Sequence, residues 1–239
     1  MLALAAIVAI AFTVEAAIGF GATIVTMAVG SLFVPVREIL PAFLPLNVAL
    51  SAYLVLRYRD RIDSRFLLSR LLPFMALGLP LGLLAFARLS ESGLERALGT
   101  FVVVLSILEL LPRRNPSPRA LPKAAEIGLG VLGGAIHGAF AMGGPVAVYV
   151  VGRAIEDKGT FRSTLSLLWL VLNSVLLGSY ALDGRFDSSA IERSVALIPA
   201  LGLGMVIGEV VHRRVPATQF QTGVFAALAI AGVVLIGRA

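Results

Sequence analysis

The stretch "TVEAAIGFGATIVTMAVG", Thr13 to Gly30, lies inside an apolar run that extends from Leu2 to Val34 without a basic residue. A straight helix through this run would be about 48 Å long, whereas the hydrocarbon core of a bilayer is about 30 Å thick. The run also holds a carboxylate and two glycines near its middle. Because glycine ends helices readily, we predict that the run breaks at "GFG" instead of continuing as one straight span.

The composition of the whole chain predicts an all-α integral membrane protein. Of its 239 residues, 58% are hydrophobic and 14% are charged, and the mean hydropathy is +0.94; this is far more apolar than an ordinary soluble domain. The apolar runs are Leu2 to Val34, Leu40 to Leu56, Phe66 to Ala87, Leu94 to Leu111, Ala124 to Val151, Phe161 to Leu182, Ala190 to Val211 and Phe220 to Ile236. We therefore expect a multi-pass protein of a cell membrane, and the bacterial cytoplasmic membrane fits best.

The same composition argues against other classes of protein. The net charge of +6 comes from basic residues in the short gaps between apolar runs, where membrane topology explains them, so we expect no nucleic-acid partner. The chain has no cysteine and two histidines, and it lacks the H-E-x-x-H and G-x-S-x-G motifs of metal-dependent and nucleophilic hydrolases. We predict no enzymatic activity, no cofactor and no metal site.

The chain contains an internal repeat. A shift of 122 residues places Gly21 on Gly143, and a shift of 126 residues superposes the P-x4-G-x3-G patterns of "PFMALGLPLG" and "PALGLGMVIG". We predict two membrane repeats, residues 1–111 and 124–239, joined by a Pro/Arg-rich linker over residues 112–123. The glycines of the repeated pattern, for which close helix packing is the favoured interpretation, are Gly78, Gly82, Gly204 and Gly208.

The second repeat also begins with a long run, and its "MGGP" (residues 142–145) predicts a second break. Each broken run forms either a kinked span or a re-entrant hairpin that returns to its own side. If both are hairpins, the basic residues divide fourteen against six between the two sides; if all eight runs cross, they divide twelve against eight. The positive-inside rule therefore favours hairpins. Each half then has three further crossings, and the two halves are inverted relative to each other.

Broken helices at membrane depth are tolerated where they line a protein-enclosed site. The helices that restart after the two breaks present free N–H groups and the positive ends of their dipoles, which favour an anion. We predict that a small anion binds between the two hairpin tips. The residues predicted to bind it are Gly19, Gly21, Thr23, Asn47, Gly143, Gly144, Pro145 and Asn173.

Glu15 and His137 occupy equivalent positions in the two repeats, 122 residues apart. An ionisable residue at membrane depth usually has a function, and histidine titrates near neutral pH, so the pair is predicted to carry the coupling proton. The alternative is structural: Glu15 satisfies backbone groups freed by the break, or it pairs with His137.

These features resemble the TauE/SafE family of sulfite exporters. The resemblance is carried by "EAAIGFGATIV", "HGAFAMGGPVAVYVVG", "LPLNVALSAYLVLRYRDRID", the "PFMALGLPLG" repeat and the mid-chain linker, which together extend over nearly the whole chain. It implies a permease for small sulfur-containing anions such as sulfite, thiosulfate or a sulfonate such as sulfoacetate, or for other organic anions. The first break departs from the family pattern, because "IGFGATIV" lacks consecutive glycines and a following proline.

A different class of transporter also fits the breaks. Glu15 and the carbonyl ends of broken helices can bind Na⁺ or H⁺, so a cation-coupled transporter or channel is the alternative function. The partners expected from the sequence are the lipid bilayer and the small anionic substrate. The direction of transport, the coupling ion and the oligomeric state stay open, a homodimer included.

Overall fold

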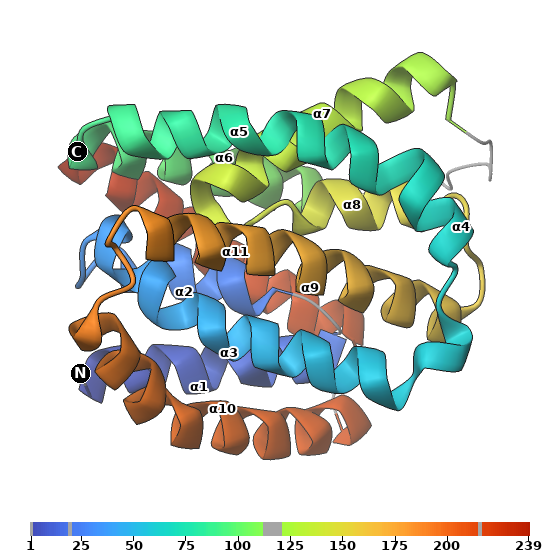
Figure 1. Cartoon of the computed structure of the whole chain (residues 1–239). Coiled ribbons are helices and arrows are strands. Elements are labelled where there is room, and N and C mark those ends of the chain that lie inside the picture. Colours follow the sequence, from blue (N-terminus) through green and yellow to red (C-terminus); the bar gives the residue numbers. More distant parts are fainter. Residues whose placement is uncertain (1, 19–20, 112–120, 215–216) are drawn as a thin grey trace. The chain divides into compact units, whose positions relative to one another are not determined.

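The chain is helical throughout the part that the structure describes. The computed structural model describes residues 2–18, 21–111, 121–214 and 217–239, and no strand occurs among them (Figure 1). The helices are α1 (Leu2–Ile18), α2 (Ala22–Gly30), α3 (Val36–Arg57), η1 (Arg59–Arg61), α4 (Ser64–Phe66), η2 (Leu67–Leu71), α5 (Leu72–Arg88), α6 (Glu91–Leu110), α7 (Lys123–Phe140), α8 (Gly144–Val151), α9 (Lys158–Leu182), α10 (Ser188–Arg214) and α11 (Ala217–Arg238). Most of the predicted linker lies outside the described residues.

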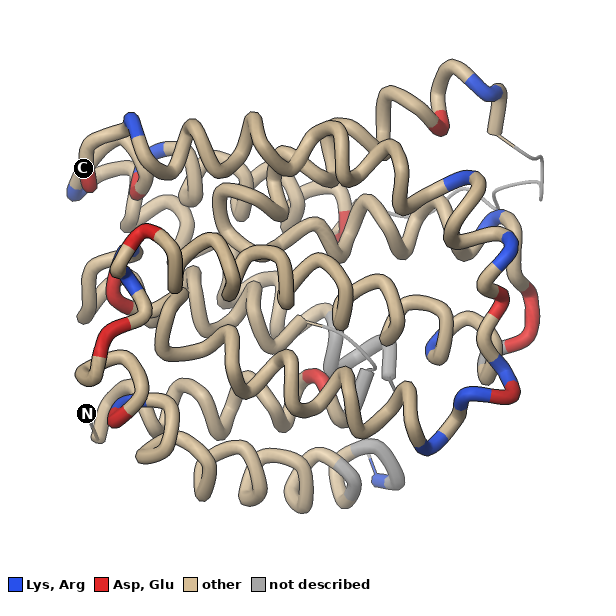
Figure 2. The backbone as a smooth tube through the Cα atoms, viewed as in Figure 1, with Lys and Arg blue, Asp and Glu red and all other residues tan. Residues whose placement is uncertain are grey.

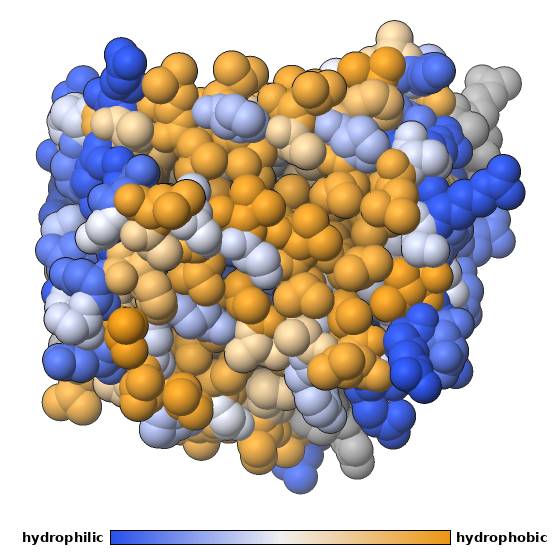
Figure 3. Space-filling model, in the orientation of Figure 1, coloured by the Kyte–Doolittle hydropathy of each residue, from blue (hydrophilic) through white to orange (hydrophobic). Residues whose placement is uncertain are grey.

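Among the described residues, four helical segments are long and apolar enough to cross a membrane: Val36–Arg57, Ser64–Arg88, Gly159–Leu182 and Ser188–Gly208. Two shorter apolar helices lie at Leu2–Ala16 and Thr222–Arg238. Most charged residues lie at or near helix ends (Figure 2). Hydrophobic side chains cover most of the visible helix surface between those ends (Figure 3). The predicted all-α membrane protein is confirmed.

The helices pack as two compact units, and each unit takes helices from both halves of the sequence. Unit 1 comprises residues 1–43, 89–113 and 186–239, and unit 2 comprises residues 44–88 and 114–185. Helix α1 therefore packs on α10, and α7 packs on α5. The broken run that begins each half of the sequence therefore packs against a helix from the other half.

The repeated glycines make the same contact in both units. A Cβ on Gly78 would lie 1.9 Å from the carbonyl oxygen of Val131 on α7, and a Cβ on Gly204 would lie 2.4 Å from that of Ala9 on α1. Val131 and Ala9 are themselves 122 residues apart. Gly82 and Gly208 form the next pair, against the carbonyl oxygens of Ala135 and Thr13 at 2.0 and 2.6 Å. The predicted packing role of these glycines is confirmed, because only glycine permits so close a backbone approach.

Both broken runs reverse direction. In unit 2, a Cβ on Gly133 of α7 would lie 3.2 Å from Val146 of α8, although thirteen residues of straight helix would separate them by about 20 Å. In unit 1, a Cβ on Gly30 of α2 would lie 3.7 Å from Leu4 near the start of α1. Each run is therefore a helical hairpin, and a kinked continuous span does not describe it.

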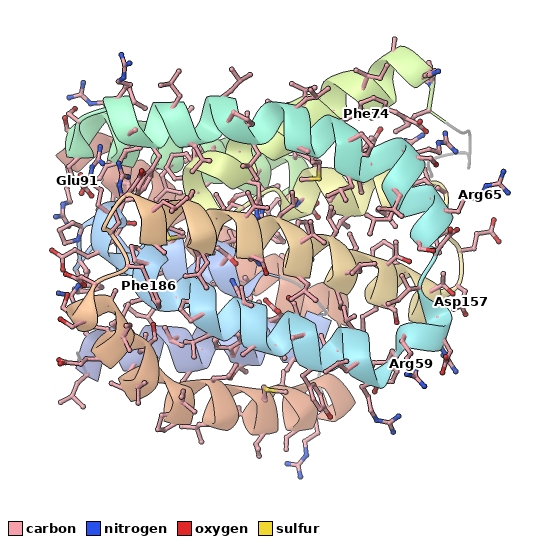
Figure 4. The ribbon with its side chains drawn as sticks, in the orientation of Figure 1. Arg59, Arg65, Phe74, Glu91, Asp157 and Phe186 are labelled. Atoms are coloured by element: carbon pink, nitrogen blue, oxygen red, sulfur yellow. The ribbon has the colours of Figure 1, made fainter. Side chains whose placement is uncertain are left out.

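The charged gaps group as the hairpin arrangement predicts. At one end of unit 2, Asp63 accepts at its side chain from the Phe66 amide and donates its own N–H to Thr164 Oγ1 of α9 at 3.0 Å, and Arg70 pairs with Glu126 of α7. Figure 4 labels Arg59, Arg65 and Asp157 at this end. At the opposite end of unit 2, Arg185 lies over the Phe86 ring, 5.1 Å from its centroid. The basic gaps 57–70 and 153–162 thus share one end.

In unit 1, basic residues from the gaps assigned to the less basic side contact residues of the other gaps on that side. Arg37 pairs with Glu91 at 3.6 Å, and Arg193 pairs with Glu38 at 2.6 Å. The side chain of Arg238 donates to the Leu32 carbonyl. Since the paired residues come from all four gaps assigned to the less basic side, the contacts agree with the hairpin arrangement.

Exposed aspartates stand at the starts of α9 and α10. Asp157 caps α9 by accepting from the Thr160 amide at 2.7 Å, and Asp187 accepts from the Ala190 amide at 2.9 Å near the start of α10. These backbone hydrogen bonds favour the charged form and hold the pKa of each carboxyl below its usual value. Both helix starts are therefore fixed by ionised caps at neutral pH.

Candidate anion-binding site

The start of α8 is built by the sequence "AMGGP". Helix α7 ends at Phe140, and Ala141 adopts the left-handed conformation with φ of 54° while its amide bonds the His137 carbonyl at 2.7 Å. Gly143 caps α8, and Pro145 stands in its first turn. Pro145 has no N–H, and the Ala147 amide is bound to the Gly143 carbonyl. The amides of Gly144 and Val146 have no carbonyl four residues back within α8, and they are the donors that this helix end can offer.

Three side chains of unit 2 converge on this helix start. His137 of α7 stacks on Trp169 of α9, with ring centroids 5.6 Å apart and 14° between the planes. Asn173, one turn further along α9, is the polar neighbour of His137. His137 is 1% exposed and Asn173 is 4% exposed. These residues come from two helices that the hairpin holds together.

Three polar atoms of His137 and Asn173 are buried without hydrogen-bond partners. Within the described part of the chain, neither imidazole nitrogen of His137 nor the Oδ1 atom of Asn173 makes a hydrogen bond of good geometry. His137 and Asn173 are close enough to interact electrostatically, but they are not aligned as donor and acceptor. Buried polar atoms are nearly always paired, so these unpaired atoms indicate a place for water or a polar ligand.

The two glycines at this point have different surroundings. A Cβ on Gly143 would lie 2.6 Å from the Gly133 carbonyl oxygen, and 2.9 Å from both His137 Cβ and Met75 Cε. A Cβ on Gly144 would meet nothing closer than Trp169 Cζ2 at 3.9 Å. Gly143 is therefore required for packing. At Gly144 there is room for a small group beside the Trp169 ring, so a ligand can approach the backbone there.

The first hairpin ends in a different arrangement. Gly21 caps α2 with φ of 110°, a conformation that side-chain-bearing residues rarely adopt. The Ala22 amide, the first of α2, donates to Glu15 Oε2 at 3.0 Å. The carboxylate of α1 therefore lies at the N-terminus of α2, where its charge complements the helix dipole.

The predicted site residues divide between the two units. His137, Gly143, Gly144, Pro145, Asn47 and Asn173 belong to unit 2, whereas Glu15, Gly21 and Thr23 belong to unit 1. Gly19 lies outside the described residues. The structure brings His137, Gly143, Gly144 and Asn173 together, and Asn47 is buried on the part of α3 that belongs to unit 2. The structural alternative holds for Glu15 in one respect, since Glu15 satisfies a backbone amide at the break.

Met75 is a site neighbour that the sequence did not suggest. Its Cε atom would meet a Cβ on Gly143 at 2.9 Å and one on Gly133 at 3.4 Å. Met75 lies in the repeated "PFMALGLPLG" stretch, but Leu201 occupies the equivalent position of the second half, so the repeat gives no signal for it. Trp169 could be found from its spacing, one helical turn before Asn173.

This chemistry suits an anion. Helix N–H donors, an Asn amide and an imidazole can all donate hydrogen bonds to an oxyanion. The described residues contain no group of three or more His, Cys, Asp or Glu side chains arranged to hold a metal ion. At the first break, the Glu15 carboxylate accepts from the Ala22 amide.

Long apolar spans and broken helices that reverse direction together define a polytopic membrane protein, and the buried unpaired polar atoms at a break mark its candidate binding site. Comparison with known proteins then gives the family. The chain matches the family described as sulfite exporter TauE/SafE over residues 3–235. It belongs to this family, and the predicted resemblance is confirmed.

One curated relative is similar over much of its length. The chain is 24% identical over 166 residues, 69% of either protein, to a "Probable inner membrane transporter protein TsaS" of Comamonas testosteroni. No solved structure matches the chain significantly. The protein is a multi-pass membrane transporter of the cell membrane.

Proposed function

We propose that this protein is a secondary transporter that moves a small sulfur-containing anion, such as sulfite, thiosulfate or sulfoacetate, across the cytoplasmic membrane by alternating access. The observation that carries the proposal is the cluster of buried, unpaired polar atoms of His137 and Asn173 beside the N-terminus of α8. The family description supports sulfur oxyanions over other small anions.

In this proposal each group at the α8 start has one task. The amides of Gly144 and Val146 donate to the oxyanion, and Asn173 adds a side-chain donor. Trp169 packs against His137 and fixes the plane of the imidazole. Binding of the anion gives a partner to amide donors that have none within α8.

Of the two residues predicted to carry the coupling proton, we propose His137 for this role, because the Glu15 carboxylate is held by the Ala22 amide at the start of α2. A proton taken up by His137 adds a positive charge beside a bound anion, which couples the two bindings. The cation-coupled alternative loses support at Glu15, because this carboxylate accepts from the Ala22 amide. Alternating access itself is supported by the repeated helix contacts, which give each hairpin the same kind of partner helix.

The experiment is uptake of [³⁵S]thiosulfate into proteoliposomes that contain the purified protein, with sulfite, sulfoacetate, sulfate and acetate as competitors. Asn173→Ala removes a donor to a charged ligand, which is worth about 1.5–3 kcal/mol, so the apparent affinity should fall roughly 10- to 100-fold. Ser179→Ala is the matched control on α9, since the Ser179 hydroxyl bonds only the Leu176 carbonyl among the contacts seen.

Sulfur anions that compete with thiosulfate, while acetate does not, support the proposal. Uptake that is equal in Asn173→Ala and Ser179→Ala would contradict the assigned site. An absence of uptake for every sulfur anion, under proton and Na⁺ gradients alike, would contradict the proposed function.

A further inference from the structure

We propose that Glu15 is a built-in anion of the first hairpin: its carboxylate occupies the N-terminus of α2, so the chain binds one substrate anion, at the second hairpin, and not two. The single-substrate part of this inference rests on the proposed function. The occupancy of the α2 N-terminus by Glu15 does not.

The argument begins with the duplication. Gly21 and Gly143 are equivalent, and both cap the helix that restarts after a break. Each restarting helix offers amides that have no carbonyl partner within the helix. On backbone grounds alone, the protein therefore has two equivalent places for an anion.

The side chains make these places unequal. At the first, Glu15 Oε2 accepts from the Ala22 amide at 3.0 Å. At the second, the residue equivalent to Glu15 is His137, which brings no negative charge. His137 and Asn173 instead leave buried polar atoms unpaired beside the helix start. One helix end thus already holds a carboxylate, and the other has beside it an imidazole and an amide side chain, each of which has an N–H group that can donate to an oxyanion.

The consequence is that a substrate anion at α2 must compete with a tethered carboxylate. The tether keeps Glu15 at a high effective concentration, and its negative charge repels a second anion nearby. Glu15 therefore occupies one of the two duplicated anion sites itself, and its hydrogen bond connects α1 to the start of α2.

The test replaces the tethered carboxylate by a free one. Glu15→Ala removes the carboxylate and leaves its space, whereas Glu15→Gln fills that space with a neutral group that can still accept from Ala22. Formate, titrated into each purified protein, should raise the melting temperature of Glu15→Ala by several degrees more than that of the wild type or of Glu15→Gln. Formamide, the neutral analogue, should have no such selective effect.

Equal formate responses in all three proteins would overturn the inference. Infrared difference spectra of the wild type against Glu15→Gln give a second readout that does not need the alanine variant to fold. At neutral pH, the band that the wild type shows and Glu15→Gln lacks should be that of an ionised carboxylate. If the missing band is that of a protonated carboxyl group, the inference is overturned.

Stoichiometry separates this inference from the proposed function. Equilibrium dialysis with [³⁵S]thiosulfate should give one ion bound per wild-type chain. Two ions per chain would overturn the inference and leave the transporter proposal standing. No bound ion would count against the proposed function, while the formate and infrared results would still decide the role of Glu15.

Discussion

At the scale of single residues, the neighbouring glycines at the start of α8 separate packing from binding. Gly143→Ala places a methyl group within 3 Å of Gly133, His137 and Met75. Overpacking of this kind costs about 1–3 kcal/mol, so we expect a lower melting temperature. Gly144→Ala meets only Trp169 at 3.9 Å, so the melting temperature of the unliganded protein should be unchanged.

For thiosulfate affinity we expect the opposite order, with Gly144→Ala more severe than Gly143→Ala. The methyl group of Gly144→Ala would stand where a ligand approaches the backbone, and thiosulfate affinity should fall at least about tenfold, as for the loss of one charge-assisted hydrogen bond. Wild-type affinity in Gly144→Ala, measured by equilibrium dialysis, would show that the anion does not use this helix end.

Ala141 carries the one positive φ found outside glycine among the described residues, at 54°. The left-handed conformation costs an ordinary residue about 1–2 kcal/mol. Glycine at this position would avoid that cost, but the greater freedom of glycine in the unfolded chain offsets part of the gain. We expect Ala141→Gly to stabilise the protein by about 0.5–1 kcal/mol, seen as a higher melting temperature. Ala139→Gly, inside α7, is the control and should destabilise. A lower melting temperature for Ala141→Gly would be inconsistent with strain at this turn.

At the scale of helices, the glycine contacts predict a matched set of effects. Gly82→Ala would place a Cβ 2.0 Å from the Ala135 carbonyl oxygen in unit 2, and Gly208→Ala would place one 2.6 Å from that of Thr13 in unit 1. Each should cost at least about 1–3 kcal/mol by forcing helices apart. Gly178→Ala, which meets nothing within 4 Å, should be neutral or stabilising. Thermal melts in detergent compare the three, and equal effects would argue against close packing at the repeated pattern.

Much at this scale was predictable from the sequence. The apolar runs locate the helices to within a few residues, because an apolar segment in a membrane protein has little choice but to be helical. The breaks at Gly21 and at Gly143 to Pro145 follow from the local chemistry of glycine and proline. The repeated P-x4-G-x3-G pattern identified the close-packed faces of α5 and α10.

The partners of those faces were not predictable. Nothing in the periodicity of α5 says that its glycines meet α7 of the other half, because partner choice depends on contacts between distant segments. The contrast between Glu15 and His137 was visible in the sequence, but only geometry showed that Glu15 bonds the Ala22 amide while His137 stays unpaired.

At the scale of the whole molecule, the hairpins fix which loops share a side of the membrane. The chain has no cysteine, so single-cysteine variants need no altered background. Lys123→Cys and Arg153→Cys flank the second hairpin and should react with an impermeant maleimide from the same side, whereas Asp183→Cys, after α9 has crossed, should react from the other. Labelling of positions 123 and 153 from opposite sides would contradict the hairpin.

The inversion of the two halves stays a prediction, and the same reagent tests it. Arg37 follows the first hairpin as Arg153 follows the second. If the halves are inverted, Arg37→Cys and Arg153→Cys should react from opposite sides, and the side of Arg153 should be cytoplasmic by the positive-inside rule. Labelling of both from one side would mean that the repeats are parallel.

The most direct test of the account is the melting temperature of the purified protein against a panel of sulfite, thiosulfate, sulfoacetate, sulfate, acetate, chloride and Na⁺, with Asn173→Ala as the paired variant. A ligand that binds the folded state stabilises it by about 2.7 kcal/mol at a hundredfold excess over Kd, and this stabilisation raises the melting temperature. We predict stabilisation by at least one sulfur oxyanion that Asn173→Ala abolishes. Stabilisation by Na⁺ alone, unchanged in Asn173→Ala, would contradict an anion site at the start of α8.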